Sequence, residues 1–254
     1  MTTRRDALIA AATLPLLAAF AGSAEENIQF FAVPAADLKY PTVINPLKPY
    51  GSKPPDQAQI TRAANVLNAA PKGPKPFDVA SYFVSSAVPP DLVQQWPSNE
   101  AWNPVIVRFF EATDYKASSD MVPWCAAFVN WCLVRSQRKS SGKPSSQSFL
   151  DTTQFQQTNS PVIGDLVVFT CHRVTDQTPI GLGHVGFLAS VPSDERMLVL
   201  GGNQSRPGTS SQISKEWFPA NSAAFDRCLS RDTNGRCKGS VRVTLRVSAF
   251  VHLI

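Results

Sequence analysis

The segment that decides the fold is "MVPWCAAFVNWCL", Met121 to Leu133, where two cysteines stand seven residues apart in an apolar run. Apolar residues recur here with the spacing of one helical face, namely Cys125, Phe128, Val129, Cys132 and Leu133. Proline is favoured in the first turn of a helix and disfavoured in its interior. We therefore predict a helix that starts at Pro123 and buries one face.

The two cysteines are predicted to have different roles. Cys125 lies in the first helical turn, where free backbone N–H groups and the helix dipole favour a thiolate, so it is the candidate nucleophile. Cys132 lies two turns further along, where packing dominates, and is expected to be a buried structural thiol. A helix separates their Cα atoms by about 10 Å, beyond the ~7 Å that a disulfide spans.

A cysteine nucleophile needs a base, and the chain has three histidines. His184 in "GLGHVGFLAS" follows two glycines at the start of a predicted strand, which lets a partner approach closely, and it is the favoured base. His172, beside Cys171, and His252 in the terminal "AFVHLI" remain weaker candidates, because lone histidines are more often structural.

The second ring nitrogen of the base needs a polar partner, and Asn203 in "LVLGGNQS" is the candidate. It follows His184 by 19 residues, so a hairpin sets the two side by side. The alternatives are that residues 201–203 only form a turn, or that Asn-Gln-Ser is a glycosylation acceptor. Asp120 is expected to cap the helix, with contact to a substrate amine as the alternative.

The order of elements predicts an α+β domain with an antiparallel sheet. "NPVIVRFFEAT" is predicted to be a helix with Asn103 as its cap and Pro104 at its first position. Four later runs have the pattern of strands, namely "GDLVVFT", "GHVGFLASV", "RMLVLGGN" and "VRVTLRV". Residues 136–160 between helices and strands read as a polar loop.

The N-terminal "MTTRRDALIAAATLPLLAAFAGSA" is typical of an export signal, with an arginine pair, an apolar run and small residues for cleavage after Ala21 or Ala24. The adjacent arginines favour the twin-arginine route over the general secretory one. The apolar run of about 15 residues is short of the ~20 that span a bilayer. We expect a signal over 1–24, a proline-rich spacer over 25–76 with a short helix in "DQAQITRAANVLNAA", and a compact domain over 77–254. The mature protein is then periplasmic or secreted, with no stable membrane span.

The net charge and the cysteine and histidine residues limit the classes of partner and ligand that we expect. Removal of the signal leaves a formal charge of about +4, which suits an anionic partner such as a cell wall, and no aromatic-interleaved basic cluster indicates nucleic acid. The Cys and His spacings do not suit a metal site, and no cofactor is expected. Five cysteines leave an odd thiol in an oxidising compartment, and a disulfide between Cys228 and Cys237 across an Asn-Gly turn is predicted. The sequence does not indicate an oligomeric state.

Four blocks in this order, "VPWCAAFVNWCL", "GDLVVF", "GHVGFLAS" and "LVLGGNQS", resemble the NlpC/P60 and CHAP superfamily of cell-wall cysteine peptidases and amidases, in particular small exported CHAP-like domains. The resemblance extends from about Phe77 to Ser205. It implies a papain-like fold and peptidoglycan peptide or amide bonds as substrate. By motif match it implies Cys125 as nucleophile, His184 as base and Asn203 as the orienting residue, although many members of the superfamily use a second histidine or a glutamate in the third role.

The function expected from the sequence is therefore that of an exported cysteine hydrolase that cleaves peptidoglycan through a thioester acyl-enzyme. One alternative is a non-catalytic binding module on the same scaffold, which a disulfide between Cys125 and Cys171 would favour. Another is an acyl transferase that passes the thioester to an amine.

Overall fold

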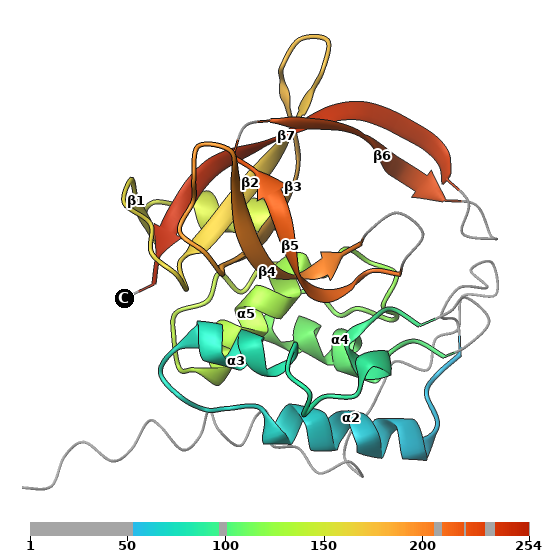
Figure 1. Cartoon of the computed structure of the whole chain (residues 1–254). Coiled ribbons are helices and arrows are strands. Elements are labelled where there is room, and N and C mark those ends of the chain that lie inside the picture. Colours follow the sequence, from blue (N-terminus) through green and yellow to red (C-terminus); the bar gives the residue numbers. More distant parts are fainter. Residues whose placement is uncertain (1–52, 97–100, 206–209, 221, 232–236, 254) are drawn as a thin grey trace, which may run out of the picture.

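The computed structural model describes residues 53–96, 101–205, 210–220, 222–231 and 237–253. Helices gather on one side of a single antiparallel sheet, which confirms the predicted α+β class (Figure 1). The expected signal peptide lies outside the described residues. In the part of the chain that is described, no helix combines the length and apolar character needed to cross a membrane.

Seven strands form the sheet in the order β1-β7-β2-β3-β4-β5, with β6 paired to β7. The strands are β1 (Gln156–Thr158), β2 (Leu166–Arg173), β3 (Pro179–Leu188), β4 (Arg196–Gln204), β5 (Gln212–Pro219), β6 (Ala223–Arg231) and β7 (Cys237–His252). The four predicted strands correspond to β2, β3, β4 and the centre of β7. Strands β1, β5 and β6 were not expected from the sequence, and β1 lies in the segment predicted to be a polar loop.

The helices stack outward from the sheet (Figure 1). They are α2 (Gln57–Ala69), α3 (Pro76–Tyr82), α4 (Pro104–Phe109) and α5 (Cys125–Arg135), with 3-10 turns η2 (Pro90–Val93), η3 (Phe110–Ala112) and η4 (Ser146–Leu150). Helix α5 contacts β3 and β4, α3 and α4 contact α5, and α2 contacts α4. The predicted cap of α4 is confirmed, because the Asn103 side chain accepts a hydrogen bond from the Val105 N–H.

Helix α2 is the short helix expected inside the spacer, and it begins with a capping box formed by Asp56 and Gln59. Ala63, Val66 and Leu67 are buried in the same apolar core as α3, α4 and α5. The compact unit thus includes α2 as well as the residues that follow Phe77.

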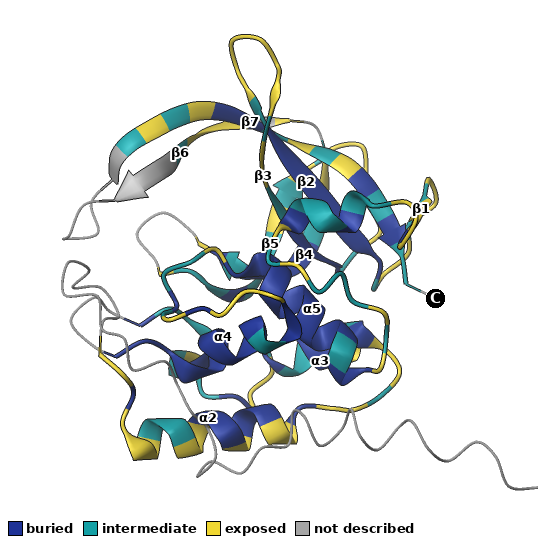
Figure 2. Cartoon of the chain, turned by 180° about the vertical axis from the view of Figure 1, so that it is seen from behind, coloured by how far each residue is buried: buried dark blue, intermediate teal, exposed yellow. Residues whose placement is uncertain are grey.

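Helix α5 is buried on nearly all sides, and not on one face as the periodicity predicts (Figure 2). It lies between the sheet and α3 with α4, so both of its faces meet protein. Edge-to-face ring contacts join Phe128 and Trp131 of α5 to Phe83 and Phe109. This packing fixes the start of α5 relative to the sheet.

The two faces of the sheet carry separate apolar clusters. Leu166 and Val168 of β2 face the core shared with the helices, whereas Val167 and Phe169 belong to a second cluster on the opposite face. His184 is the cross-strand partner of Phe169, and their rings lie 6.2 Å apart. The imidazole therefore lies on the face that turns away from the helices.

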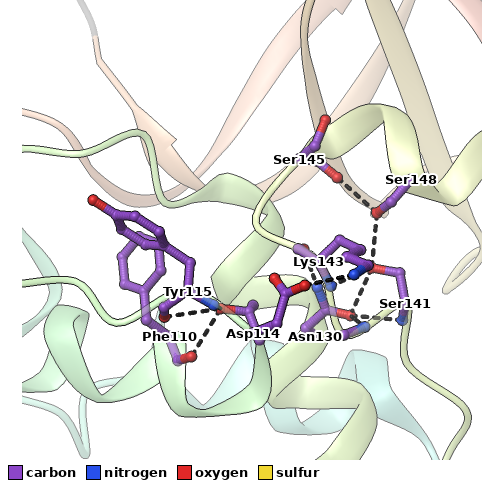
Figure 3. A network of polar contacts seen from close by, with 10 residues as sticks. Phe110, Asp114, Tyr115, Asn130, Ser141, Lys143, Ser145 and Ser148 are labelled. Atoms are coloured by element: carbon purple, nitrogen blue, oxygen red, sulfur yellow. Dashed lines mark hydrogen bonds and ion pairs between the residues drawn. The ribbon is translucent and has the colours of Figure 1, made fainter.

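A buried amide anchors the polar segment after α5 (Figure 3). Asn130 Oδ1 accepts hydrogen bonds from the Ser141 and Gly142 N–H groups and from the Ser141 hydroxyl, and Asn130 Nδ2 donates to the Lys143 carbonyl. The Ser148 hydroxyl then donates to Ser141 Oγ. These bonds hold the segment that leads to η4 and β1 against α5.

Candidate active site

Cys125 occupies the first position of α5, which follows Trp124 as a cap residue without a side-chain hydrogen bond. Cys125 is 6% exposed, and its helix packs against β3. Burial raises the pKa of Cys125, although hydrogen bonds from the Val185 and Ala126 N–H groups and the charge of Arg227 favour the thiolate. The expected depressed pKa is therefore wrong: loss of hydration outweighs the helix start, and the resting thiol is neutral.

Asp120 does not cap α5. Its Oδ2 accepts hydrogen bonds from the backbone N–H groups of Trp96, at 3.0 Å, and Asn103, at 2.9 Å. Burial raises the pKa of Asp120 to about 6 against these bonds. The carboxyl group thus ties the loop after η2 to the start of α4, and the predicted cap is wrong because the side chain turns back toward α4.

His184 lies in β3, where its ring stacks on Phe218 of β5 with centroids 5.5 Å apart. Burial, aided by the charge of Arg227, lowers the pKa of His184 to about 4, so the imidazole is neutral at physiological pH. The other two histidines have partners elsewhere: His172 Nδ1 contacts the Gln177 carbonyl, and His252 Nδ1 contacts Asp165 Oδ1.

The Cys125 thiol lies next to the backbone of β3, where β3 and β4 separate. These strands are paired only at Phe187 with Leu200 and Leu188 with Val199. Beyond this point the Val185 N–H is directed at the Cys125 sulfur. A thiol from the helical face thus lies at the peptide bond that follows His184. No hydrogen bond between thiol and ring is present in the described structure, and such bonds are often long before substrate binds.

The amide on the His184 ring belongs to Gln204. Continuation of the β3–β4 register would set Asn203 opposite His184, as the spacing of 19 residues predicts. However, β4 has a bulge between Gly201 and Gln204, with Asn203 at a φ of 59°. Gln204 Nε2 lies 3.2 Å from His184 Nε2, and its Oε1 accepts a hydrogen bond from the Ser214 hydroxyl at 3.1 Å. Asn203 makes no such contact in the described structure.

The glycine pair before Asn203 permits this arrangement on both faces of β4. A Cβ at Gly201 would lie 2.6 Å from Gln204 Nε2 and 3.2 Å from His184 Nε2, in the space that the amide uses. A Cβ at Gly202 would lie 2.4 Å from the Trp124 ring, directly before Cys125. The pair is the sequence signal for the bulge, although it does not say which amide reaches the ring.

The remaining thiols fit structural roles. Cys132 is fully buried, as predicted, and burial raises its pKa well above the usual value. Cys125 and Cys171 are both free, so the disulfide that would favour a binding module is absent. In the β6–β7 register, Cys228 is paired with Ser240 and Cys237 with Arg231, so the two cysteines are not directly opposite each other. The structure does not describe their side chains. The disulfide between them stays a prediction.

The described residues include no group of three or more His, Cys, Asp or Glu side chains that could hold a metal ion.

Comparison with known proteins gives one match. Residues 117–203, about one third of the chain, match the CHAP domain family, and this span contains Cys125, His184 and Asn203 but stops before Gln204. No curated protein and no solved structure matches. The match supports the CHAP superfamily for this segment, and with it a hydrolase of the amidase or peptidase kind whose substrate class is peptidoglycan.

Proposed function

We propose that this protein is an exported cysteine hydrolase that cleaves peptide or amide bonds of peptidoglycan, with Cys125 as its nucleophile and a papain-like arrangement shared with NlpC/P60 domains. The observation that carries the proposal is the position of the Cys125 thiol, at the first residue of α5 and against the N–H that follows His184, inside the CHAP match. Export by the twin-arginine route to the periplasm or medium, with no cofactor, is part of the proposal.

The resting pair is a neutral thiol and a neutral imidazole, because burial raises the pKa of Cys125 and lowers that of His184. Attack therefore requires that His184 take the thiol proton as the sulfur bonds to the scissile carbonyl carbon. The Val185 and Ala126 N–H groups stabilise the negative charge that develops on the sulfur. The pair thus acts by general-base catalysis and not as a preformed ion pair.

Gln204 sets the proton on the ring. The two ends of its amide are interchangeable, since the Ser214 hydroxyl can donate to the oxygen or accept from the nitrogen. With the oxygen toward the ring, His184 Nε2–H donates to Gln204 and Nδ1 is left to accept the thiol proton. Gln204 then also stabilises the imidazolium that forms, which makes it a positioning residue.

The acyl transfer is completed in two steps. The tetrahedral intermediate collapses to a thioester on Cys125 as His184 returns the proton to the leaving amine. Water then attacks the thioester with His184 as base, and the thiol is released. The backbone N–H of Cys125, at the helix start, is suited to receive the oxyanion.

The test is muropeptide analysis of purified peptidoglycan after digestion with the mature protein. New products are expected from the wild type and from Cys132→Ala, whose thiol lies in the same helix but inside the core, and none from Cys125→Ala. The proposal is refuted by a wild type that releases nothing, or by a Cys125→Ala variant that releases the same products.

A further inference from the structure

Arg227 reaches the site from a part of the chain that the CHAP match does not cover. It lies in β6, and the β6–β7 hairpin forms the arm that arches from the sheet in Figure 1. The guanidinium donates a hydrogen bond from Nη1 to Cys171 Sγ over 3.5 Å. This contact connects β6 to β2, although the strands are separated by β7.

The contact places the Arg227 charge on the face of the sheet that bears His184. Cys171 lies two residues after Phe169 in β2, so the two side chains share a face, and Phe169 lies beside the His184 ring. The same charge lowers the pKa of both Cys125 and His184. The hydrogen bond to Cys171 and the two effects on pKa thus place one cation near both reacting groups.

The charge has no carboxylate partner among the described residues. A thiol is a weak acceptor and occupies one of five guanidinium N–H donors. Arg242, in the same hairpin, is different: it forms an exposed ion pair with Asp226 at 2.9 Å. A planar fork of donors, partly buried beside neutral groups, is suited to bind one carboxylate through two hydrogen bonds.

We propose that Arg227 forms a subsite that binds a carboxylate of the peptidoglycan stem peptide next to the scissile bond. The subsite rests on the proposed function, and it makes the β6–β7 hairpin a determinant of specificity that lies outside the matched domain. A carboxamide at the same position of the peptide would keep its shape but lose the charge-assisted contact.

Binding and turnover test the subsite separately. Binding is measured by calorimetry on the mature Cys125→Ala protein, with two synthetic stem peptides that differ only in free carboxylates against carboxamides. We expect roughly ten- to a hundredfold tighter binding of the carboxylate form, the size of a charged hydrogen bond. Adding Arg227→Gln should abolish this preference, and Arg227→Lys should retain part of it. Arg242→Gln is the matched control from the same hairpin and should retain all of it.

Three results would overturn the subsite. The Cys125→Ala protein could show no preference for the carboxylate peptide, or the preference could survive the addition of Arg227→Gln. In the otherwise wild-type enzyme, Arg227→Gln could lower the turnover of both peptides equally. The last result would assign the charge to the reacting atoms themselves. Failure of the proposed function gives a different result. A protein that does not cleave peptidoglycan and binds neither peptide contradicts the hydrolase. An enzyme that cleaves peptidoglycan but does not prefer the carboxylate peptide contradicts only the subsite.

Discussion

Replacement of Gln204 by alanine removes the amide that contacts the His184 ring at 3.2 Å. In the proposed mechanism this ring gains a proton as the thiol attacks, so the lost contact is a hydrogen bond to a charged group in the transition state. Such bonds contribute about 1.5–3 kcal/mol. We therefore expect Gln204→Ala to lower kcat by roughly ten- to a hundredfold, with KM little changed.

The matched control is the neighbouring residue. Asn203 has a φ of 59°, which glycine adopts freely, so Asn203→Gly keeps the bulge while removing the amide that the sequence favours. We expect its kcat to stay within about twofold of the wild type. The assay is the initial rate of product release from a synthetic stem peptide, with the melting temperature of each variant as a check on folding.

The pH dependence of kcat/KM shows whether residue 204 acts on the His184 ring or only fills space beside it. In Gln204→Glu a carboxylate would face the ring, and an opposite charge raises the pKa of His184 from about 4. Because the neutral ring is the active base, the acid limb of kcat/KM should move to higher pH. Gln204 is not the positioning residue if Asn203→Gly loses more activity than Gln204→Ala, or if Gln204→Glu leaves the acid limb in place.

Three further predictions concern stability. Gly202→Ala sets a Cβ 2.4 Å from the Trp124 ring and should lower the free energy of unfolding by about 1–3 kcal/mol, and an unchanged urea midpoint would contradict this. Asn130→Ala removes four hydrogen bonds of a buried amide, and urea unfolding should show a loss of about 2–4 kcal/mol; a loss below 1 kcal/mol would show that the loop is held elsewhere. The raised pKa of Asp120, about 6, means that the folded state binds its proton more tightly than the unfolded one. Its contribution to stability is therefore full below about pH 4 and falls by about 3 kcal/mol as pH rises to 7, a slope that Asp120→Asn should remove in unfolding measured across this range.

The elements that the sequence predicts well are those whose own residues carry the signal. Helix α4 has a cap and a proline at its first position, α2 has a capping box, and β2 is a continuous apolar run. Strand β5 lacks such a signal, because Ile213 is its only buried residue and the exposed Lys215 and Trp217 share its face, so "QISKEWFP" becomes a strand through its pairing with β4. Edge strands of this kind depend on partners that a local pattern does not contain.

In the candidate site, too, some residues are predicted from local sequence and others depend on the fold. Cys125 and His184 are the residues that their local motifs single out. The pairing of Phe187 with Leu200, if extended along both strands, would set position 203 opposite the histidine. The bulge then displaces that position by one residue and turns Gln204 to the ring. A change of one residue exchanges the faces of a strand, so the identity of the third residue depends on backbone geometry that spacing alone does not determine.

Cys125 lies at the start of a helix, as predicted, but its pKa is raised and not lowered. The sequence places the thiol at a helix start, and the structure agrees, but a helix end contributes at most about 2 kcal/mol in favour of a charge. Packing of α5 between two layers removes the thiol from water, and desolvation is the larger effect on its pKa. Because both the desolvation of Cys125 and the charge of Arg227 come from segments far away in the chain, the reactivity of this thiol is a property of the assembled fold and not of its motif.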